Sequence, residues 1–146
     1  MYKVDLWVWT DSRSPKEDMK AYAYSIEMKR PSGEIYRKTG EDNVSGTWNK
    51  AVLTATAKAL ERFNTNAEVT IHTENRWVLN MMEHNLMIWE GADFWKSSKE
   101  KVANEEEWRR IAKAGHSLKL VADPIGFDRS ELLYKHVFRE DEKCDG

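Results

Sequence analysis

In the stretch AEVTIHTENRWVLNMM, residues 67–82, the apolar residues first alternate as in a strand and then, without a break, follow the spacing of a helix. Val69 and Ile71 alternate with polar residues, which predicts a half-buried strand over 68–73. The apolar residues from 76 to 82 then fall at helical spacing, so a helix follows the strand. Glu74 lies at the junction, either as a candidate metal ligand at a strand end or as an ordinary acid that favours the start of the next helix.

The segment before this stretch predicts three strands joined by short turns. Residues 4–10 alternate apolar and polar side chains and are rich in β-branched and aromatic residues, as strands are. A loop over 11–16 follows, then period-two apolar residues over 22–28, a Pro-Ser-Gly turn at 31–33 and a third strand over 34–39. We expect these three strands to form an antiparallel meander.

Helical patterns dominate the rest of the chain. Residues 48–63 place their apolar side chains on one face without a Gly or Pro, and a charged helix is expected over 105–114. A connection rich in Trp and Lys covers 89–104, a short strand 118–121, and a last helix 130–138. The order predicts an α/β fold in which a mixed five-stranded sheet, strands 1 to 3 antiparallel, is flanked by helices.

Length and composition favour one compact domain. The chain has 146 residues, 40% of them hydrophobic, and we expect a single domain over 1–138 followed by a charged tail over 139–146. The start lacks secretory-signal features and no apolar run approaches the roughly 18 residues of a membrane span, so a cytoplasmic protein without a membrane partner is expected. The lone Cys144 cannot form an internal disulfide.

The charge and the histidine positions argue against a broadly basic nucleic-acid surface and against a histidine metal site. With 23 basic and 25 acidic residues the formal net charge is only −2, so any binding of nucleic acid must use local patches. The four histidines have no metal-ligand spacing, and we expect ordinary surface or core positions for His72, His84, His116 and His136.

Four stretches, taken in order, resemble type 1 ribonuclease H over nearly the whole chain. They are VWTDS (8–12), WNKAVLTATAKAL (48–60), the stretch 67–82 already quoted, and FWKSSKEKVANEEEWRRI (94–111). No single stretch is diagnostic, but their order and spacing together are specific. The resemblance implies a ribonuclease H-like fold.

The resemblance also implies chemistry. Ribonuclease H cleaves the RNA strand of an RNA:DNA hybrid with two divalent ions, Mg²⁺ or Mn²⁺, which carboxylates hold. Carried over by position, the catalytic and metal-binding acids are Asp11, Glu74 and Glu131, with Asp128 as an alternative metal ligand to Glu131. The acid of the family's first helix is missing, because Val52 stands there.

This departure leaves two interpretations of the site open. An isopropyl group coordinates nothing, and the loop over 122–127 lacks the family's histidine, which together predict a degenerate site with lost or much reduced cleavage. In the wider superfamily, however, three acids at the positions of Asp11, Glu74 and Glu131 form a working site.

The resemblance implies a nucleic-acid surface as well. The family contacts the hybrid through its first helix and through a basic protrusion, although here the acids Glu90, Asp93 and Glu100 dilute the protrusion and its Trp residues have packing as an alternative role. The implied binding residues are Arg13, Asn49, Lys50, Trp95, Lys96, Lys99, Lys101 and Asn104.

Three functions follow as hypotheses. The first is a nucleic-acid-associated protein with a degenerate active site, for which an RNA:DNA hybrid is a possible partner. The second is an active Mg²⁺- or Mn²⁺-dependent nuclease with a three-carboxylate site. The third is a protein-interaction module that keeps only the fold.

Overall fold

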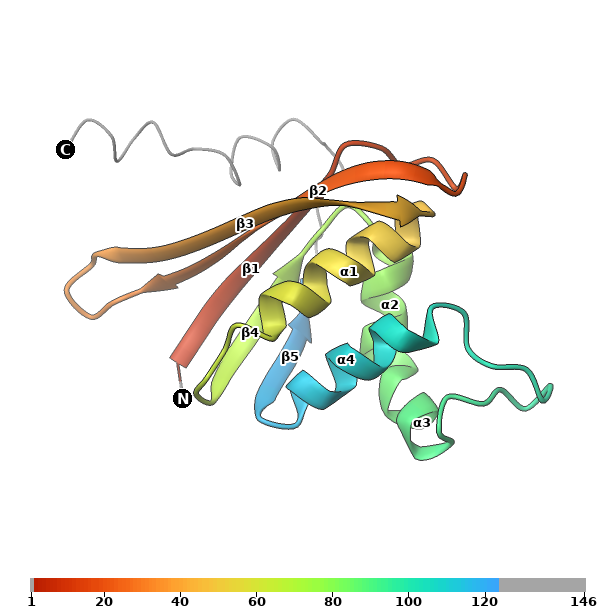
Figure 1. Cartoon of the computed structure of the whole chain (residues 1–146). Coiled ribbons are helices and arrows are strands. Elements are labelled where there is room, and N and C mark those ends of the chain that lie inside the picture. Colours follow the sequence, from red (N-terminus) through yellow and green to blue (C-terminus); the bar gives the residue numbers. More distant parts are fainter. Residues whose placement is uncertain (1, 124–146) are drawn as a thin grey trace.

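The structure is a computed structural model and describes residues 2–123, which form one five-stranded sheet and four helices (Figure 1). The strands are β1 (Tyr2–Thr10), β2 (Asp18–Lys29), β3 (Ile35–Gly46), β4 (Ala67–His72) and β5 (Leu118–Ala122). The helices are α1 (Trp48–Leu60), α2 (Arg76–His84), α3 (Leu86–Gly91) and α4 (Glu105–Gly115).

The sheet has the order β3-β2-β1-β4-β5 and mixed strand directions. Strands β1, β2 and β3 pair antiparallel, whereas β4 pairs parallel with both β1 and β5. Leu6 at the centre of β1 lies opposite Ile26 of β2 and Ile71 of β4. The prediction of a mixed α/β fold with an antiparallel meander is therefore confirmed.

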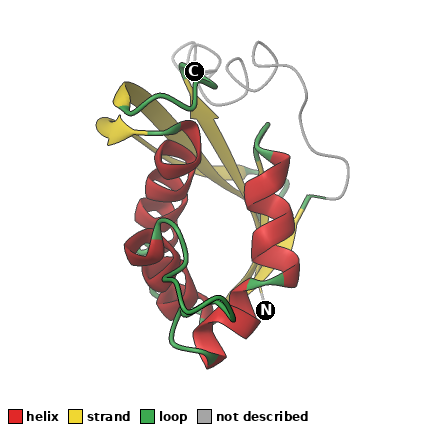
Figure 2. Cartoon of the chain, turned by 90° about the vertical axis from the view of Figure 1, so that its right-hand side faces the viewer, coloured by secondary structure: helices red, strands yellow, loops and turns green. Residues whose placement is uncertain are grey.

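The core lies between the sheet and α1. Val4, Leu6 and Val8 alternate along β1 toward this core, as the period of a strand requires. Helix α1 buries most of its length, and its small alanines let it approach the sheet closely. Seen from the side, the helices stand in two columns against the strands (Figure 2).

The hairpin of β2 and β3 is longer than the sequence predicts, with twelve residues in each strand. The polar run over 40–46 has low β-propensity, but its pairing with β2 overrides that preference. Gly40 has a steric role, since a Cβ there would lie 2.5 Å from the ring of Tyr24. The extended hairpin therefore depends on a glycine opposite an aromatic ring.

The helices also differ from the prediction. Helix α1 ends at Leu60, not at residue 63. Helix α3 was not predicted, because it is short and leaves Met87 and Ile88 exposed, which gives it no clear apolar face. The helix predicted over 130–138 and the domain limit at residue 138 lie outside the described residues.

Within residues 2–123, no helix is long and apolar enough to cross a membrane.

A buried amine fixes the loop that follows β1. The Lys20 side chain is 0% exposed, and its Nζ donates to the carbonyl oxygens of Lys16 (2.6 Å) and Gly46 (2.7 Å) and to Oδ1 of Asp18 (2.5 Å). The hydrogen bond from Lys20 lowers the pKa of the Asp18 carboxyl. The loop over 11–17 is thereby joined to the end of β3.

Candidate functional site

The ends of two neighbouring parallel strands bring Asp11 and Glu74 to one edge of the sheet. Asp11 follows β1 directly, and Glu74 lies two residues after β4. The start of α1 reaches the same edge, where Trp48 Nε1 donates to Thr10 Oγ1 over 3.1 Å. Asp11, Glu74 and the start of α1 therefore lie at the same edge of the sheet, although they are far apart in the sequence.

Asp11 continues the hydrogen-bond ladder between β1 and β2. Its N–H donates to the carbonyl oxygen of Ala21 and its Oδ1 accepts from the N–H of Ala21, each over 3.0 Å. The side chain is exposed. One carboxylate oxygen is therefore already occupied by the backbone, a contact that also suits the simpler role of a residue ending a strand.

Glu74 is buried and paired with an arginine. Its side chain is 4% exposed, and Nη2 of Arg13 lies 3.3 Å from its Oε1. The Arg13 side chain is 56% exposed and comes from the loop that Lys20 holds. A buried carboxylate requires a counter-charge, and the guanidinium supplies one within the protein.

Asn75 connects the starts of two helices. It is fully buried and caps α2, because its Oδ1 accepts from the N–H of Val78 over 2.9 Å. Its Nδ2 donates to Oδ1 of Asn49 over 2.8 Å. Asn49, a predicted nucleic-acid contact, thus uses its carbonyl oxygen inside the protein. The sequence did not single out Asn75, although an Asn just before an apolar helix is a cap signal.

Val52 belongs to the core. It is 1% exposed and lies one turn into α1 among the buried side chains that face the sheet. The position where the family has an acid is therefore filled by a packed apolar group. Asp128 and Glu131, the predicted late-helix acids, lie outside the described residues.

The described acids do not complete a metal site. Among residues 2–123 no three His, Cys, Asp or Glu side chains are grouped to hold an ion. Asp11 has one oxygen on a backbone N–H, and Glu74 has one beside a guanidinium. Mg²⁺ can be bound by one or two carboxylates and waters, but two adjacent ions need more bridging oxygens than this pair offers.

The handle loop, residues 92–104, extends beyond α3 and α4, away from the sheet (Figure 1). Trp95 is 47% exposed, and Nζ of Lys101 lies 4.4 Å from the centre of its ring. The same amine is 3.3 Å from Oε2 of Glu105, so its charge is partly neutralised. Lys96 and Lys99 are exposed and make no ion pair with another described residue. The accessible positive charge of the handle loop therefore lies on these two lysines.

The two tryptophans of the 89–104 connection differ. Trp89 packs edge-on against the buried Trp108, with ring centres 5.4 Å apart, and anchors the segment to the body. Trp95 instead presents its ring at the surface beside Lys101. The packing role holds for Trp89, and Trp95 stays available for contact with a partner.

His72 has a setting that the sequence did not reveal. Its Nε2 lies 2.8 Å from Oδ1 of Asp5 and its Nδ1 lies 2.7 Å from Oδ2 of Asp123. Its ring stacks on Trp7 with centroids 3.9 Å apart. The period of the strands places this group on the face of the sheet opposite Val4 and Ile71, so it is separate from the core. The pairing of β4 with β1 on one side and with β5 on the other brings these residues together.

Comparisons with known proteins identify the fold. No protein-family model and no curated protein sequence matches the chain. Among solved structures, LC9 ribonuclease H1, a type 1 ribonuclease H with the type 2 active-site motif, matches with a TM-score of 0.67 and 17% identity over 98% of this chain and 74% of that one. The foamy viral protease-reverse transcriptase in complex with an RNA/DNA hybrid matches with a TM-score of 0.68 and 15% identity.

That match covers 97% of this chain but only 20% of the viral protein. LC11 ribonuclease H1, isolated from compost by a metagenomic approach, matches with a TM-score of 0.56 and 16% identity over the full length of both chains. The fold is therefore ribonuclease H-like, as the four sequence stretches predicted.

Proposed function

We propose that this chain is a ribonuclease H-like protein of the cytoplasm that binds nucleic acid, with an RNA:DNA hybrid as the first candidate, and cleaves it little or not at all. The observation that carries the proposal is the state of the buried acid Glu74, which is neutralised by Arg13 while the neighbouring helix offers Val52 in place of a carboxylate.

Electrostatics supports loss of cleavage. A guanidinium 3.3 Å from Glu74 repels a divalent cation that approaches the same oxygens, and water screens part of this repulsion because the Arg13 side chain is 56% exposed. If an ion binds, Asp11 and Glu74 would hold it with Glu131 or Asp128, and it would activate a water and stabilise charge on the phosphate.

Surface charge supports binding. Lys50 lies in the first turn of α1, with its aliphatic chain against Gly46, and Lys96 and Lys99 are exposed on the handle loop. Lysines of this kind contact phosphates without reading sequence. The foamy viral protein, 20% of which matches this fold, is itself in complex with an RNA/DNA hybrid, which makes that duplex the first probe.

A cleavage assay tests the catalytic half of the proposal. Purified protein is incubated with an end-labelled RNA:DNA hybrid and Mg²⁺ or Mn²⁺, beside an Asp11→Asn variant. We expect both proteins to give the same background. Metal-dependent cutting that Asp11→Asn abolishes would contradict the proposal and support the three-carboxylate nuclease.

A binding assay tests the other half. Fluorescence anisotropy with labelled hybrid should show binding that weakens with salt, because lysine contacts release counterions. Lys96→Met with Lys99→Met should weaken binding about tenfold and flatten the salt dependence, whereas Lys29→Met, an exposed lysine at the other end of β2, should not. No binding to hybrid, duplex or single strands would favour the protein-interaction module.

A further inference from the structure

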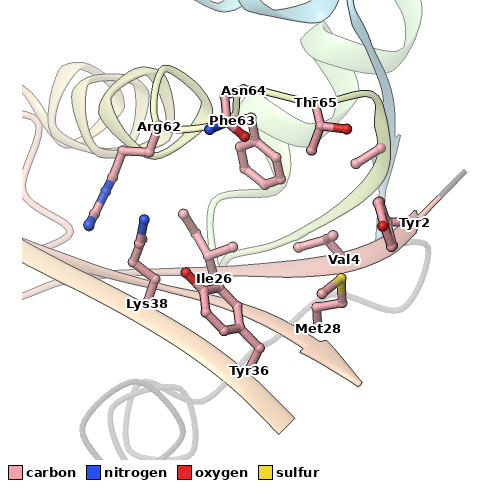
Figure 3. Close-up of a pocket in the computed structure, with 11 residues that line it drawn as sticks. Tyr2, Val4, Ile26, Met28, Tyr36, Lys38, Arg62, Phe63, Asn64 and Thr65 are labelled. Atoms are coloured by element: carbon pink, nitrogen blue, oxygen red, sulfur yellow. The ribbon is translucent and has the colours of Figure 1, made fainter. Parts of the chain in front are cut away.

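A cavity of about 320 Å³ opens at the end of the sheet away from Asp11. It lies beside Tyr2 at the start of β1, and a strand of this length separates it from Asp11 by roughly 30 Å at about 3.3 Å per residue. Figure 3 shows the side chains around it. They come from β1, β2, β3, the segment that joins α1 to β4, and the first residue of β4: Tyr2, Val4, Ile26, Met28, Tyr36, Lys38, Arg62, Phe63, Asn64, Thr65 and Ala67.

The walls of this cavity are mainly apolar and aromatic. Val4 and Ile26 are buried at its base, and Phe63 packs on the core from the α1 side. Tyr2 and Tyr36 are exposed at its edges. Exposed aromatic rings around a hollow offer contact area to a flat apolar molecule.

Two positive charges converge at the opening. Figure 3 shows the head groups of Lys38, from β3, and Arg62, from the segment after α1, extending into the same space. Nη1 of Arg62 donates to the Tyr24 hydroxyl and to the carbonyl oxygen of Thr39, each over 3.0 Å, so the guanidinium is held in place by neutral acceptors.

Neither of these cations has an acidic partner among residues 2–123. Two neighbouring positive charges repel each other, and an anion bound between them offsets this repulsion by attracting both. Within the part of the chain that the structure describes, the Nε and Nη2 donors of Arg62 make no hydrogen bond, because both of its bonds come from Nη1. The arrangement thus provides both charge and directed N–H groups for an anion.

We propose that this cavity binds a small aromatic anion, with its flat body against Tyr36 and Phe63 and its carboxylate or phosphate between Lys38 and Arg62. The volume, at the lower end of ligand pockets, suits one or two rings. This site is independent of the proposed nucleic-acid function, since it lies at the opposite end of β1.

Titration calorimetry with 2-naphthoate tests the proposal, with 2-naphthamide as a neutral molecule of the same shape and adenosine monophosphate as the phosphate-bearing probe. We expect an anion to bind at least tenfold more tightly than the amide. Tighter binding of naphthoate assigns a carboxylate ligand, and tighter binding of the nucleotide assigns a phosphate. Equal binding of naphthoate and amide, or no binding of either anion up to about 5 mM, overturns the proposal.

We choose Lys38→Met to test the site, because the Lys38 side chain is half-exposed. Arg62 is kept, because its side chain holds Tyr24 and Thr39 by hydrogen bonds. Lys38→Met should weaken binding of the anion about tenfold and leave the amide unchanged, while Lys29→Met, outside the cavity, changes neither. Unaltered anion affinity in Lys38→Met, with the fold verified by circular dichroism, also overturns the site. Hybrid binding should not respond to this variant.

Discussion

The ion pair between Arg13 and Glu74 is unequal, because the arginine is mostly exposed and the acid is buried. Arg13→Gln leaves a buried carboxylate without this counter-charge. We expect the free energy of unfolding, measured by urea denaturation at pH 7, to fall by about 1–2 kcal/mol, less than for a fully buried pair because water screens Arg13. With Glu74→Gln already present, the same change should have little effect, and two additive losses would show that the pair is not coupled.

Val52 gives a second prediction for a single residue. Val52→Glu places a charge in the core beneath α1 and should lower the free energy of unfolding by about 3 kcal/mol or more, beyond the loss in Val52→Ala. Thermal unfolding of the two variants and the wild type, with and without Mn²⁺, measures the loss of stability. We expect no recovery with Mn²⁺, and a melting temperature that rises with the ion in Val52→Glu alone would show that the introduced carboxylate reaches a metal.

The strand pattern over 68–73 indicated that Glu74 follows a strand end, and the resemblance to ribonuclease H implied that position 52 lacks the family's acid. Neither indicated that Arg13 pairs with Glu74, or that Asn75 binds Asn49. Such contacts join loops and helix starts that are distant along the chain. Nothing in local periodicity encodes which of several nearby cations meets a buried acid.

At the scale of elements, the β2–β3 hairpin depends on Gly40. Gly40→Ala would place a methyl group 2.5 Å from the Tyr24 ring, whose hydroxyl accepts from Arg62. Overpacking of this kind should lower the free energy of unfolding by about 1–3 kcal/mol. Gly91→Ala is the control, because a methyl group there meets nothing within 4 Å, and equal losses in both variants would contradict the steric role of Gly40.

Strands and helices with a strong hydrophobic period were predicted well, whereas a segment that becomes a strand only through pairing with its neighbour was not. The alternating apolar residues of β1 and β4 and the apolar face of α1 gave these elements directly. The second half of β3 is polar and rich in turn-forming residues, and only its ladder with β2 makes it a strand. Helix α3 is too short for a periodic signal.

At the scale of the molecule, Glu61 and Arg110 join the end of α1 to α4 through two hydrogen bonds of 2.7 and 2.8 Å. The bond with Arg110 lowers the pKa of Glu61 below its ordinary value of 4.5. A lowered folded pKa stabilises the protein above about pH 4.5, and this contribution is lost as the pH falls through the folded value.

Glu61→Gln should therefore make the stability less dependent on pH below about 4.5. The difference between wild type and variant at pH 7 should be below about 1 kcal/mol, since the Glu61 side chain is 44% exposed. Urea denaturation from pH 3 to 7 measures it. Parallel curves for the two proteins across that range would contradict a role for this ion pair in acid sensitivity.

The order of strands and helices and the mixed sheet were predictable as a whole, because the parallel strands β4 and β5 follow helices and the antiparallel strands follow turns. The convergence of the cations Lys38 and Arg62 was not predictable from the sequence. Their cavity forms where the start of β1, the β2–β3 hairpin and the end of α1 meet, and no single segment contains its pattern.

The buried amine of Lys20 has a consequence for chemical labelling. Amine-reactive esters modify lysines that water reaches, such as Lys29 and Lys96, while Lys20 keeps its three acceptors and is shielded from the reagent. Acylation of Lys20 therefore requires the loop over 11–17 to separate from the end of β3. Mass spectrometry of briefly labelled protein should show Lys20 modified far more slowly than Lys29, at a rate that reports how often the loop bearing Arg13 opens.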